Sequence, residues 1–214
     1  MDIYRRLLKH FGKLNWWPGE NPFEVMVGAV LTQNTSWRNV EKAIKLLKEN
    51  GLSTPEAIIS AQKDVLLSAL KPSGYFNVKA KRLTSLCQAI LDKGSGGLYP
   101  DILKLPEEEL RETLLGVKGV GPETADSIVL YAANYPSFVV DTYTRRLLSR
   151  HGLISGNPPY EAIRRFFMDN IPKDAVLYNE YHALIVACGH HFCSPKNPSC
   201  SMCPLGKDPF LNLH

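Results

Sequence analysis

The sequence of 214 residues has no hydrophobic run long enough to cross a membrane. Its longest apolar stretch, FEVMVGAVL (23–31), is interrupted by Glu24 and falls well short of the roughly 20 residues that a membrane-spanning helix needs. The basic segment after Met1 lacks the apolar core of a signal peptide. Internal repeats and low-complexity tracts are also missing. These absences exclude a membrane-spanning protein and a repeat array, and we expect a cytoplasmic location.

The composition and the net charge limit the class of protein and its partners. Hydrophobic residues make up 44% of the chain and charged residues 21%, so the chain can bury a core and does not have the composition of a disordered protein. At this length the core belongs to one domain or to two small lobes. The formal net charge of +4 permits binding to nucleic acid but does not require it.

Signals for β-strands are also scarce, and the run FVV (138–140) is too short to build a sheet. Helix signals are frequent: Asn21 and Pro22 mark one helix start, and Ser36 marks a second helix that Gly51 ends. Helical patterns continue over 77–94, 105–116, 122–134, 142–152, 160–170 and 175–189. The sequence therefore predicts an all-α fold.

Cysteine is concentrated near the end of the chain, where four of the five cysteines lie: Cys188, Cys193, Cys200 and Cys203. A cytoplasmic protein rarely uses such a group for disulfides, so it indicates a metal or an iron–sulfur cluster. A zinc site with four cysteines is the competing interpretation. The fifth cysteine, Cys87, falls on the apolar face of a predicted helix, and we expect it in the core.

The segment LLGVKGVG (114–121) joins two predicted helices by a short hairpin. Gly119 and Gly121 permit positive φ and leave their N–H groups unobstructed at the start of the next helix, where the helix dipole favours an anion such as a phosphate. An ordinary glycine-rich connection explains the same pattern, and glycines alone do not distinguish the two interpretations. The next helix is followed by the loop NYPS (134–137) and then by a lone aspartate, Asp141.

These features occur together in one known family. GVKGVGPETADSIVLYA (116–132), the NYPS loop and FVVDTYTRR (138–146) resemble the helix–hairpin–helix, Gly/Pro-rich loop and aspartate signature of the endonuclease III superfamily of DNA glycosylases. Two further segments resemble the family in the right order. In LTQNT, Gln33 matches the residue that probes the gap left by a flipped base, and in SGYFNVKAKRL, Tyr75 matches an intercalating residue.

The resemblance implies that Asp141 is the catalytic carboxylate. Cleavage of an N-glycosidic bond builds positive charge on the sugar, which a nearby carboxylate stabilises. The same group can orient or deprotonate the attacking water, and the base must leave the duplex to reach it. Asp141 also has the simpler interpretation of an N-cap for the helix of TYTRRLLSR, and the two roles can coexist.

In bifunctional members of the family, a lysine two residues after the last hairpin glycine attacks the sugar and forms a Schiff base. This chain has Glu123 at that position, and a carboxylate cannot form an imine. Asp126 and Ser127, one turn later, do not replace the lysine. The resemblance therefore predicts a monofunctional enzyme without efficient strand cleavage. Glu123 itself is either a substrate contact in the catalytic site or a favourable acid in the first turn of its helix.

The segment NWWPGENPFEV (15–25) resembles the 3-methyladenine DNA glycosylase III branch, in which aromatic residues line the base pocket. The resemblance assigns Trp16, Trp17, Pro18 and Trp37 to this pocket, whereas core packing is the alternative for a tryptophan and is favoured for Trp17. A 3-alkyladenine in DNA is cationic, and aromatic faces attract a cation. Because that branch can lack the cysteines found here, uracil, thymine-mismatch and adenine-mismatch substrates remain open.

The terminal cysteines resemble the [4Fe-4S] site of the family, whose spacing is C-x6-C-x2-C-x5-C. Cys193, Cys200 and Cys203 match its first three positions, but the fourth would be residue 209, which is Pro209. Cys188 is the expected substitute, giving C-x4-C-x6-C-x2-C. Several basic residues are candidate phosphate contacts or solvated surface charges: Lys79, Lys81, Arg82, Arg145, Arg146 and Lys196.

The resemblance implies a two-lobed, all-α helix–hairpin–helix glycosylase fold with a C-terminal iron–sulfur cluster loop. One lobe is expected to span 21–135, and the other to join 1–20 to 136–214 and to carry the cluster loop (188–203). The hairpin is expected to bind the DNA backbone, with a monovalent cation on its carbonyls, through Val117, Lys118, Gly119, Val120 and Gly121.

The expected function is a monofunctional DNA N-glycosylase of base excision repair that acts on alkylated purines, above all 3-methyladenine. We expect it to work as a monomer on double-stranded DNA that contains a damaged base, near the nucleoid and away from membranes. Two other classes stay open. One is an endonuclease III-like glycosylase with AP lyase activity, or a uracil or mismatch glycosylase; the other is a non-catalytic protein that binds DNA structures.

Overall fold

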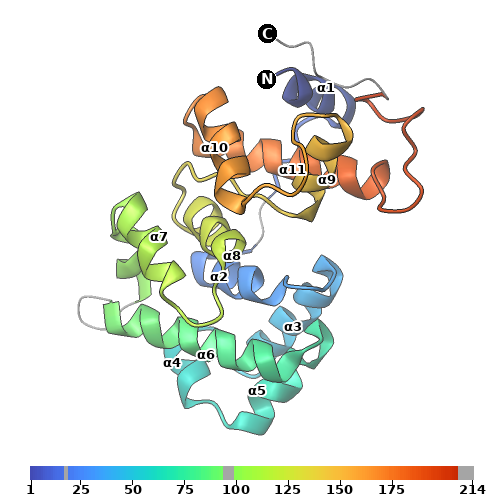
Figure 1. The fold of residues 1–214 in the computed structure, drawn as a ribbon. Coiled ribbons are helices and arrows are strands. Elements are labelled where there is room, and N and C mark those ends of the chain that lie inside the picture. The colour runs from blue at the N-terminus through green and yellow to red at the C-terminus, as the bar shows by residue number, and fades with distance from the viewer. Residues whose placement is uncertain (17–18, 94–98, 207–214) are drawn as a thin grey trace. The chain divides into compact units, whose positions relative to one another are not determined.

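The computed structural model describes residues 1–16, 19–93 and 99–206 (Figure 1). These ranges contain helices and no strand, which confirms the prediction of an all-α protein. They also contain no helix long and apolar enough to cross a membrane. Contacts divide the chain into two compact units, Met1–Trp16 with Pro136–His214 and Trp17–Tyr135.

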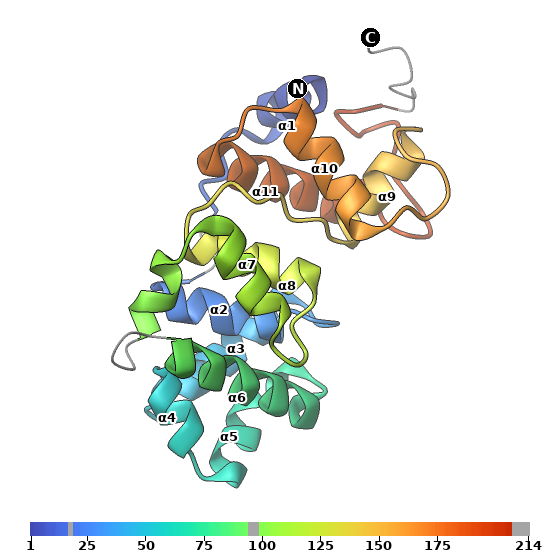
Figure 2. The ribbon, with the colours of Figure 1, turned by 60° about the vertical axis from the view of Figure 1, so that its left-hand side comes forward.

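The unit Trp17–Tyr135 is built around α2, whose side chains are almost all buried. A helix that is apolar over most of its surface is covered by its neighbours, and α2 contacts α3 (Trp37–Glu49), α6 (Phe76–Lys93), α8 (Pro122–Ser127) and η3 (Ile128–Ala132). Figure 2 shows α6 alongside α4 and α5, which it also contacts. The elements of this unit are α2 (Pro22–Leu31), α3 (Trp37–Glu49), α4 (Pro55–Ser60), α5 (Lys63–Leu70), the 3-10 turns η1 (Lys71–Ser73) and η2 (Tyr99–Lys104), α6 (Phe76–Lys93), α7 (Glu107–Leu115), α8 (Pro122–Ser127) and the π-helical segment η3 (Ile128–Ala132).

Local sequence signals explain several helix starts in this unit. The Asn21 side chain accepts a hydrogen bond of 2.9 Å from the Glu24 N–H, and Pro22 follows it in the first turn. Thr54 caps α4 in the same way through the Ala57 N–H at 3.2 Å. Cys87 is fully buried on α6, as predicted.

Lys79, predicted from the sequence as a phosphate contact or a solvated surface charge, is neither. It is only 1% exposed, and its Nζ donates to the carbonyls of Leu31 at 2.9 Å and Ser73 at 2.6 Å. Burial, with a smaller effect of the nearby Arg82 charge, lowers the pKa of Lys79. Lys79 therefore ties α6 to the ends of α2 and η1 and does not reach solvent.

The other unit contains α1 (Asp2–Phe11), α9 (Thr142–Arg150), α10 (Tyr160–Asn170) and α11 (Ala175–His191). Helix α11 contacts both α1 and α9. The segment FVV (138–140), predicted to be too short for a sheet, is buried and lies in neither a helix nor a strand. The ring of Phe138 stacks on Phe167 with centroids 3.8 Å apart. Tyr178 and Tyr181 of α11 meet Phe138 edge-on. Aromatic packing, not a sheet, holds this segment in place.

Candidate functional site

The hairpin between α7 and α8 uses only one of its two candidate glycines for an unusual backbone conformation. Gly119 has φ +93°, which favours glycine, whereas Gly121 has φ −97° and caps α8. Of the two glycines that permit positive φ, only Gly119 adopts it. A Cβ atom on Gly119 would lie 2.4 Å from the Arg82 Cγ, while a Cβ on Gly121 would meet nothing within 4 Å. Gly119 lets the hairpin lie directly against the stem of Arg82.

This difference predicts the outcome of a matched pair of substitutions. Gly119→Ser should destabilise the protein by about 1–3 kcal/mol, because it forces a side chain into positive φ and against Arg82. Gly121→Ser should be neutral or slightly stabilising, because serine is a favoured N-cap and has room there. Urea unfolding of both variants measures the difference, and equal stability losses would contradict this account of the hairpin.

Gln33 is held in a network that reaches the hairpin. Its Nε2 donates to the Thr124 hydroxyl of α8 at 3.0 Å, and its Oε1 accepts a hydrogen bond from the Arg82 guanidinium. Because Arg82 also packs against Gly119, the predicted gap-probing residue and the hairpin are linked through one side chain. Arg82 was predicted as a phosphate contact or a solvated surface charge, and its link to Gln33 was missed.

Two aromatic residues of the same unit have different surroundings. Tyr75 has φ +46° and is 73% exposed in the short connection before α6. An exposed tyrosine in a left-handed conformation is unusual, and such outliers cluster at functional sites. Trp37 is partly buried and packs against the core; a Cβ on Gly28 would lie 3.1 Å from the edge of its ring. Trp37 is therefore partly a packing residue.

Glu123 is exposed in the first turn of α8, immediately after the hairpin. The neighbouring Asp126 is fully buried, and the Arg111 guanidinium of α7 donates to its two carboxylate oxygens at 2.7 and 3.1 Å. The hydroxyl of Ser127 donates to the Glu123 carbonyl at 2.7 Å. Asp126 and Ser127 therefore have structural partners within the protein.

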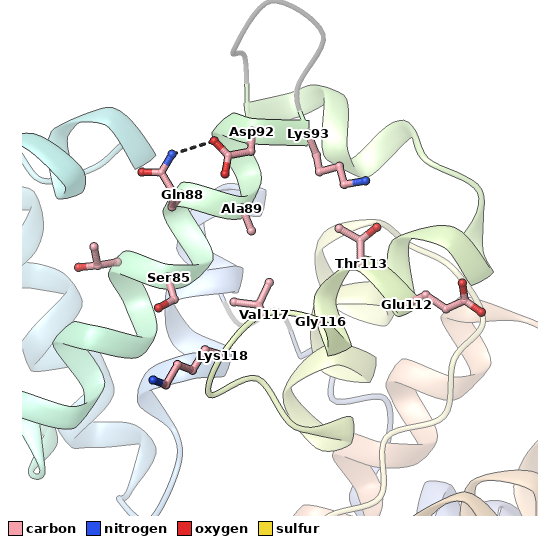
Figure 3. Close-up of a pocket in the computed structure, with 11 residues that line it drawn as sticks. Ser85, Gln88, Ala89, Asp92, Lys93, Glu112, Thr113, Gly116, Val117 and Lys118 are labelled. Carbon is pink, nitrogen blue, oxygen red and sulfur yellow. Dashed lines mark hydrogen bonds between the residues drawn. The ribbon is translucent and has the colours of Figure 1, made fainter.

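A groove of about 790 Å³ lies beside the hairpin (Figure 3). The charged side chains that line it have both signs, Lys93 and Lys118 on the one hand and Asp92 and Glu112 on the other. Asp92 accepts a hydrogen bond of 2.8 Å from Gln88. Because the charges are mixed, the groove by itself does not select an anion. Its lining residues are Thr84, Ser85, Gln88, Ala89, Asp92, Lys93, Glu112, Thr113, Gly116, Val117 and Lys118.

In the other unit, Asp141 caps the N-terminus of α9. Its Oδ1 accepts hydrogen bonds from the Thr144 N–H at 2.7 Å and the Thr144 hydroxyl at 2.9 Å, and its Oδ2 lies 3.6 Å from His182 Nε2. Burial raises the pKa of Asp141, but the His182 side chain and the two Thr144 donors outweigh burial and lower it below the usual range. The N-cap interpretation is thus confirmed, and the carboxylate is ionised at neutral pH.

Trp16 follows a segment that is tied to α11. Both oxygens of the buried Glu180 accept backbone hydrogen bonds, from the Leu14 N–H at 2.6 Å and the Asn15 N–H at 3.2 Å. Asn15 has φ +46°, and successive N–H groups in such a turn form a concave site for an anionic oxygen. Trp16 itself is partly buried, whereas Trp17 and Pro18 lie outside the described residues.

The Glu180 contact gives a second prediction. Glu180→Ala should cost about 1–2 kcal/mol of stability, since two N–H groups lose a charged acceptor. The amide protons of Leu14 and Asn15 should exchange with solvent faster in the variant. Glu161→Ala removes a glutamate whose side chain is 43% exposed and should cost little. Unchanged exchange at Leu14 and Asn15 would show that Glu180 does not hold this segment.

Glu180 and His182 are the residues that sequence reasoning missed. Both are polar and both are buried in α11, a helix whose other buried residues are mostly apolar. A charged or polar residue in the middle of an apolar helical pattern is the signal that could have found them, because such groups are rarely buried without partners.

Arginines of α9 donate hydrogen bonds to the segment that carries the cysteines (188–203). Arg146 Nε donates to the Cys193 carbonyl at 2.6 Å, and Arg150 donates to Cys193 Sγ at 3.1 Å. Arg145 donates to the Pro158 carbonyl at 2.8 Å. Arg145 and Arg146, which the sequence predicts as phosphate contacts or surface charges, therefore have partners within the protein.

The cysteine sulfurs are only partly gathered. Cys188 Sγ and Cys203 Sγ lie 3.7 Å apart, and burial, reinforced by Cys203 and Cys193, raises the pKa of the Cys188 thiol. Within residues 1–16, 19–93 and 99–206, no three His, Cys, Asp or Glu side chains are grouped so that they could hold a metal ion. The donor set suits a soft metal or an iron–sulfur cluster in composition, but the four sulfurs do not converge.

Comparison with known proteins places these features in a family. The model of the HhH-GPD superfamily base excision DNA repair proteins matches residues 27–173. A protein of Methanocaldococcus jannaschii, whose name assigns it provisionally to the DNA repair glycosylases, is 45% identical over 205 residues, which cover 95% of this chain and 92% of that protein. Endonuclease III of Thermotoga maritima is 30% identical over 205 residues, covering 94% and 88% of the two chains.

Solved structures agree with this placement. The crystal structure of the H. pylori 3-methyladenine DNA glycosylase bound to 1,N6-ethenoadenine matches with a TM-score of 0.75 and 30% identity, covering 89% of this chain and 98% of that chain. A non-covalent endonuclease III–DNA complex matches with a TM-score of 0.81 and 26% identity, covering 95% and 90%. The chain therefore belongs to the HhH-GPD superfamily of base excision DNA repair proteins, as a DNA glycosylase similar to endonuclease III.

Proposed function

We propose that the protein is a monofunctional DNA N-glycosylase that flips a damaged base out of duplex DNA and excises it, acting on alkylated purines such as 3-methyladenine. The observation that carries the proposal is the Asp141 carboxylate, which is nearly buried and yet kept ionised at the start of α9. A fixed negative charge with little water around it stabilises the positive charge that develops on the sugar as the base departs.

The two oxygens of Asp141 suit different tasks. Oδ1 is occupied by the N–H and hydroxyl of Thr144, which fix the carboxylate to α9. We assign Oδ2 to the reaction, where it faces the sugar or accepts a proton from the attacking water. Capping and catalysis are therefore compatible in one side chain.

The proposal of a monofunctional enzyme is supported by Glu123. It occupies the position at which bifunctional relatives carry the lysine that forms a Schiff base, and it has no nucleophilic nitrogen. Asp126 cannot act as that nucleophile either, because both of its carboxylate oxygens accept hydrogen bonds from Arg111. The enzyme is therefore expected to leave an intact strand with an abasic site.

The choice of alkylated purines is supported by the similarity to the H. pylori enzyme, whose name gives 3-methyladenine as its substrate. Trp16 and Trp37, neither of them fully buried, are the proposed aromatic faces for the base. Aromatic faces attract a cationic 3-alkyladenine, and such a base is already a good leaving group. We assign Gln33 and Tyr75 to the gap left by the flipped nucleotide, and the hairpin with a monovalent cation to the DNA backbone.

We also propose that Cys188, Cys193, Cys200 and Cys203 hold a [4Fe-4S] cluster. The spacing of the cysteines and the approach of Cys188 to Cys203 support it, and Arg150 supplies an N–H donor to the Cys193 sulfur. The purified protein should contain iron and acid-labile sulfide in equal amounts. Zinc without sulfide would instead indicate a four-cysteine zinc site.

A panel of duplexes tests the proposed reaction. Duplexes with methylated purines, uracil, a thymine mismatch, an adenine mismatch or an oxidised pyrimidine are incubated with the protein and analysed with and without alkali. We expect release of 3-methyladenine and strand breaks only after alkali. Breaks without alkali would identify a lyase, and release of another base alone would correct the substrate. No release from any duplex, with binding retained, would favour a non-catalytic DNA-binding protein.

A further inference from the structure

We propose that His182 is a positioning residue for Asp141: it holds the reactive oxygen of the carboxylate in place from the opposite helix. The inference rests on the proposed catalytic role of Asp141 and adds to it a second residue, on α11, that has no part in the motifs read from the sequence.

The geometry leaves one oxygen of Asp141 to be positioned from outside α9. Both hydrogen bonds from Thr144 end on Oδ1, at 2.7 and 2.9 Å. These bonds fix one corner of the carboxylate but do not define where Oδ2 lies. The polar atom that the structure places beside Oδ2 is His182 Nε2, at 3.6 Å. A catalytic contact of this length can tighten when substrate binds.

His182 is itself in a rigid setting. It is 7% exposed and lies in the middle of α11, which packs against α9 (Figure 1). A side chain that is buried on a long helix keeps its direction better than one on a loop. Two packed helices therefore hold the carboxylate from two sides, with Thr144 on α9 and His182 on α11.

The position of His182 beside Asp141 also affects the ionisation of the Asp141 carboxylate. Burial alone favours the protonated form of a carboxylic acid, which would remove the charge that the reaction needs. The groups that lower the pKa of Asp141 against burial are the His182 side chain and Thr144. His182 thus acts on the Oδ2 side of the carboxylate, whereas Thr144 acts on Oδ1.

A purely structural role for a buried histidine is the competing explanation, and matched variants separate the two. His182→Leu removes the ring nitrogens, and His182→Gln keeps an N–H donor of similar reach. His151, also buried in the same unit, is the C-cap of α9 at the far end from Asp141, so His151→Gln controls for replacing a buried histidine. Thermal unfolding of each variant establishes that it is folded.

The kinetic test uses single-turnover base release from the duplex that the wild-type protein cleaves best. His182→Leu should be slower by about 10- to 100-fold with unchanged DNA affinity, because a small displacement of a catalytic group has an effect of this size. His182→Gln should recover most of the rate, and His151→Gln should match the wild type. In an Asp141→Asn background, His182→Leu should cause no further loss, because the two residues act through one oxygen.

A second measurement does not depend on activity. The side-chain carboxyl of Asp141 is titrated by carbon NMR, with its signal assigned from Asp141→Asn. The pKa of Asp141 should be higher in His182→Leu than in the wild type, because burial remains after the favourable partner is removed. His182→Gln should fall between them, and His151→Gln should leave the titration unchanged.

These outcomes separate the inference from the proposed function. If the wild-type protein releases no base but the titration moves as expected, the pairing holds and the proposed function is wrong. If base release is normal and neither the rate nor the titration changes in His182→Leu, the inference is overturned. A rate loss that persists in full in the Asp141→Asn background, with an unchanged titration, would also overturn it.

Discussion

Asp141→Asn should lower the single-turnover rate of base release by at least about 10²- to 10³-fold. The change removes the negative charge that stabilises the sugar cation but keeps a side chain of nearly the same shape. Asparagine is as good an N-cap as aspartate, so α9 should stay capped and the protein should stay folded. The loss should therefore appear in the chemical step and not in DNA binding or in the melting temperature.

The matched control for this variant is Asp174→Asn. Asp174 caps α11 of the same unit by accepting a hydrogen bond of 3.0 Å from the Leu177 N–H, and it is exposed. The same substitution should leave base release at the wild-type rate. Rates are measured with enzyme in excess and alkali added before analysis, so that every abasic site is counted. An Asp141→Asn protein as fast as the wild type would rule out Asp141 as the catalytic carboxylate.

Asp126→Ala should destabilise the protein by about 3–5 kcal/mol. Asp126 is fully buried, and its two oxygens receive both hydrogen bonds of a fork from Arg111, whose side chain is only 16% exposed. Removing the carboxylate leaves a guanidinium inside the protein without its charged partner. Because the pair joins α7 to α8, the hairpin between these helices should be loosened first.

Urea unfolding measures this loss, and Asp92→Ala is the control. Asp92 is an exposed aspartate of the same unit that accepts one hydrogen bond from Gln88, so its removal should change stability by no more than about 0.5 kcal/mol. Replacing both members of the buried pair, as Arg111→Met with Asp126→Leu, should recover much of the stability. Equal losses for Asp126→Ala and Asp92→Ala would mean that the buried pair does not stabilise the hairpin.

The helices and the family could be read from the residues because their signals are local. Asn21 and Thr54 cap helices through N–H groups three residues away, and such contacts depend only on neighbouring residues. The hairpin glycines and Asp141 lie within one short stretch, so their order alone carried the resemblance that the family comparison confirmed. The absence of alternating apolar patterns was enough to predict the all-α fold of the described residues.

Long-range polar contacts could not be read in the same way. Glu180 binds the backbone of Leu14 and Asn15 from 166 and 165 residues away, and His182 faces Asp141 from another helix. The sequence predicts Lys79 as a surface charge or a phosphate contact, whereas in the fold its Nζ donates to the carbonyls of Leu31 and Ser73. Local pattern says which face of a helix is apolar, but it does not say which distant group a buried polar side chain will meet. Only the packing of the helices decides those partners, because burial makes each such group costly unless the fold supplies one.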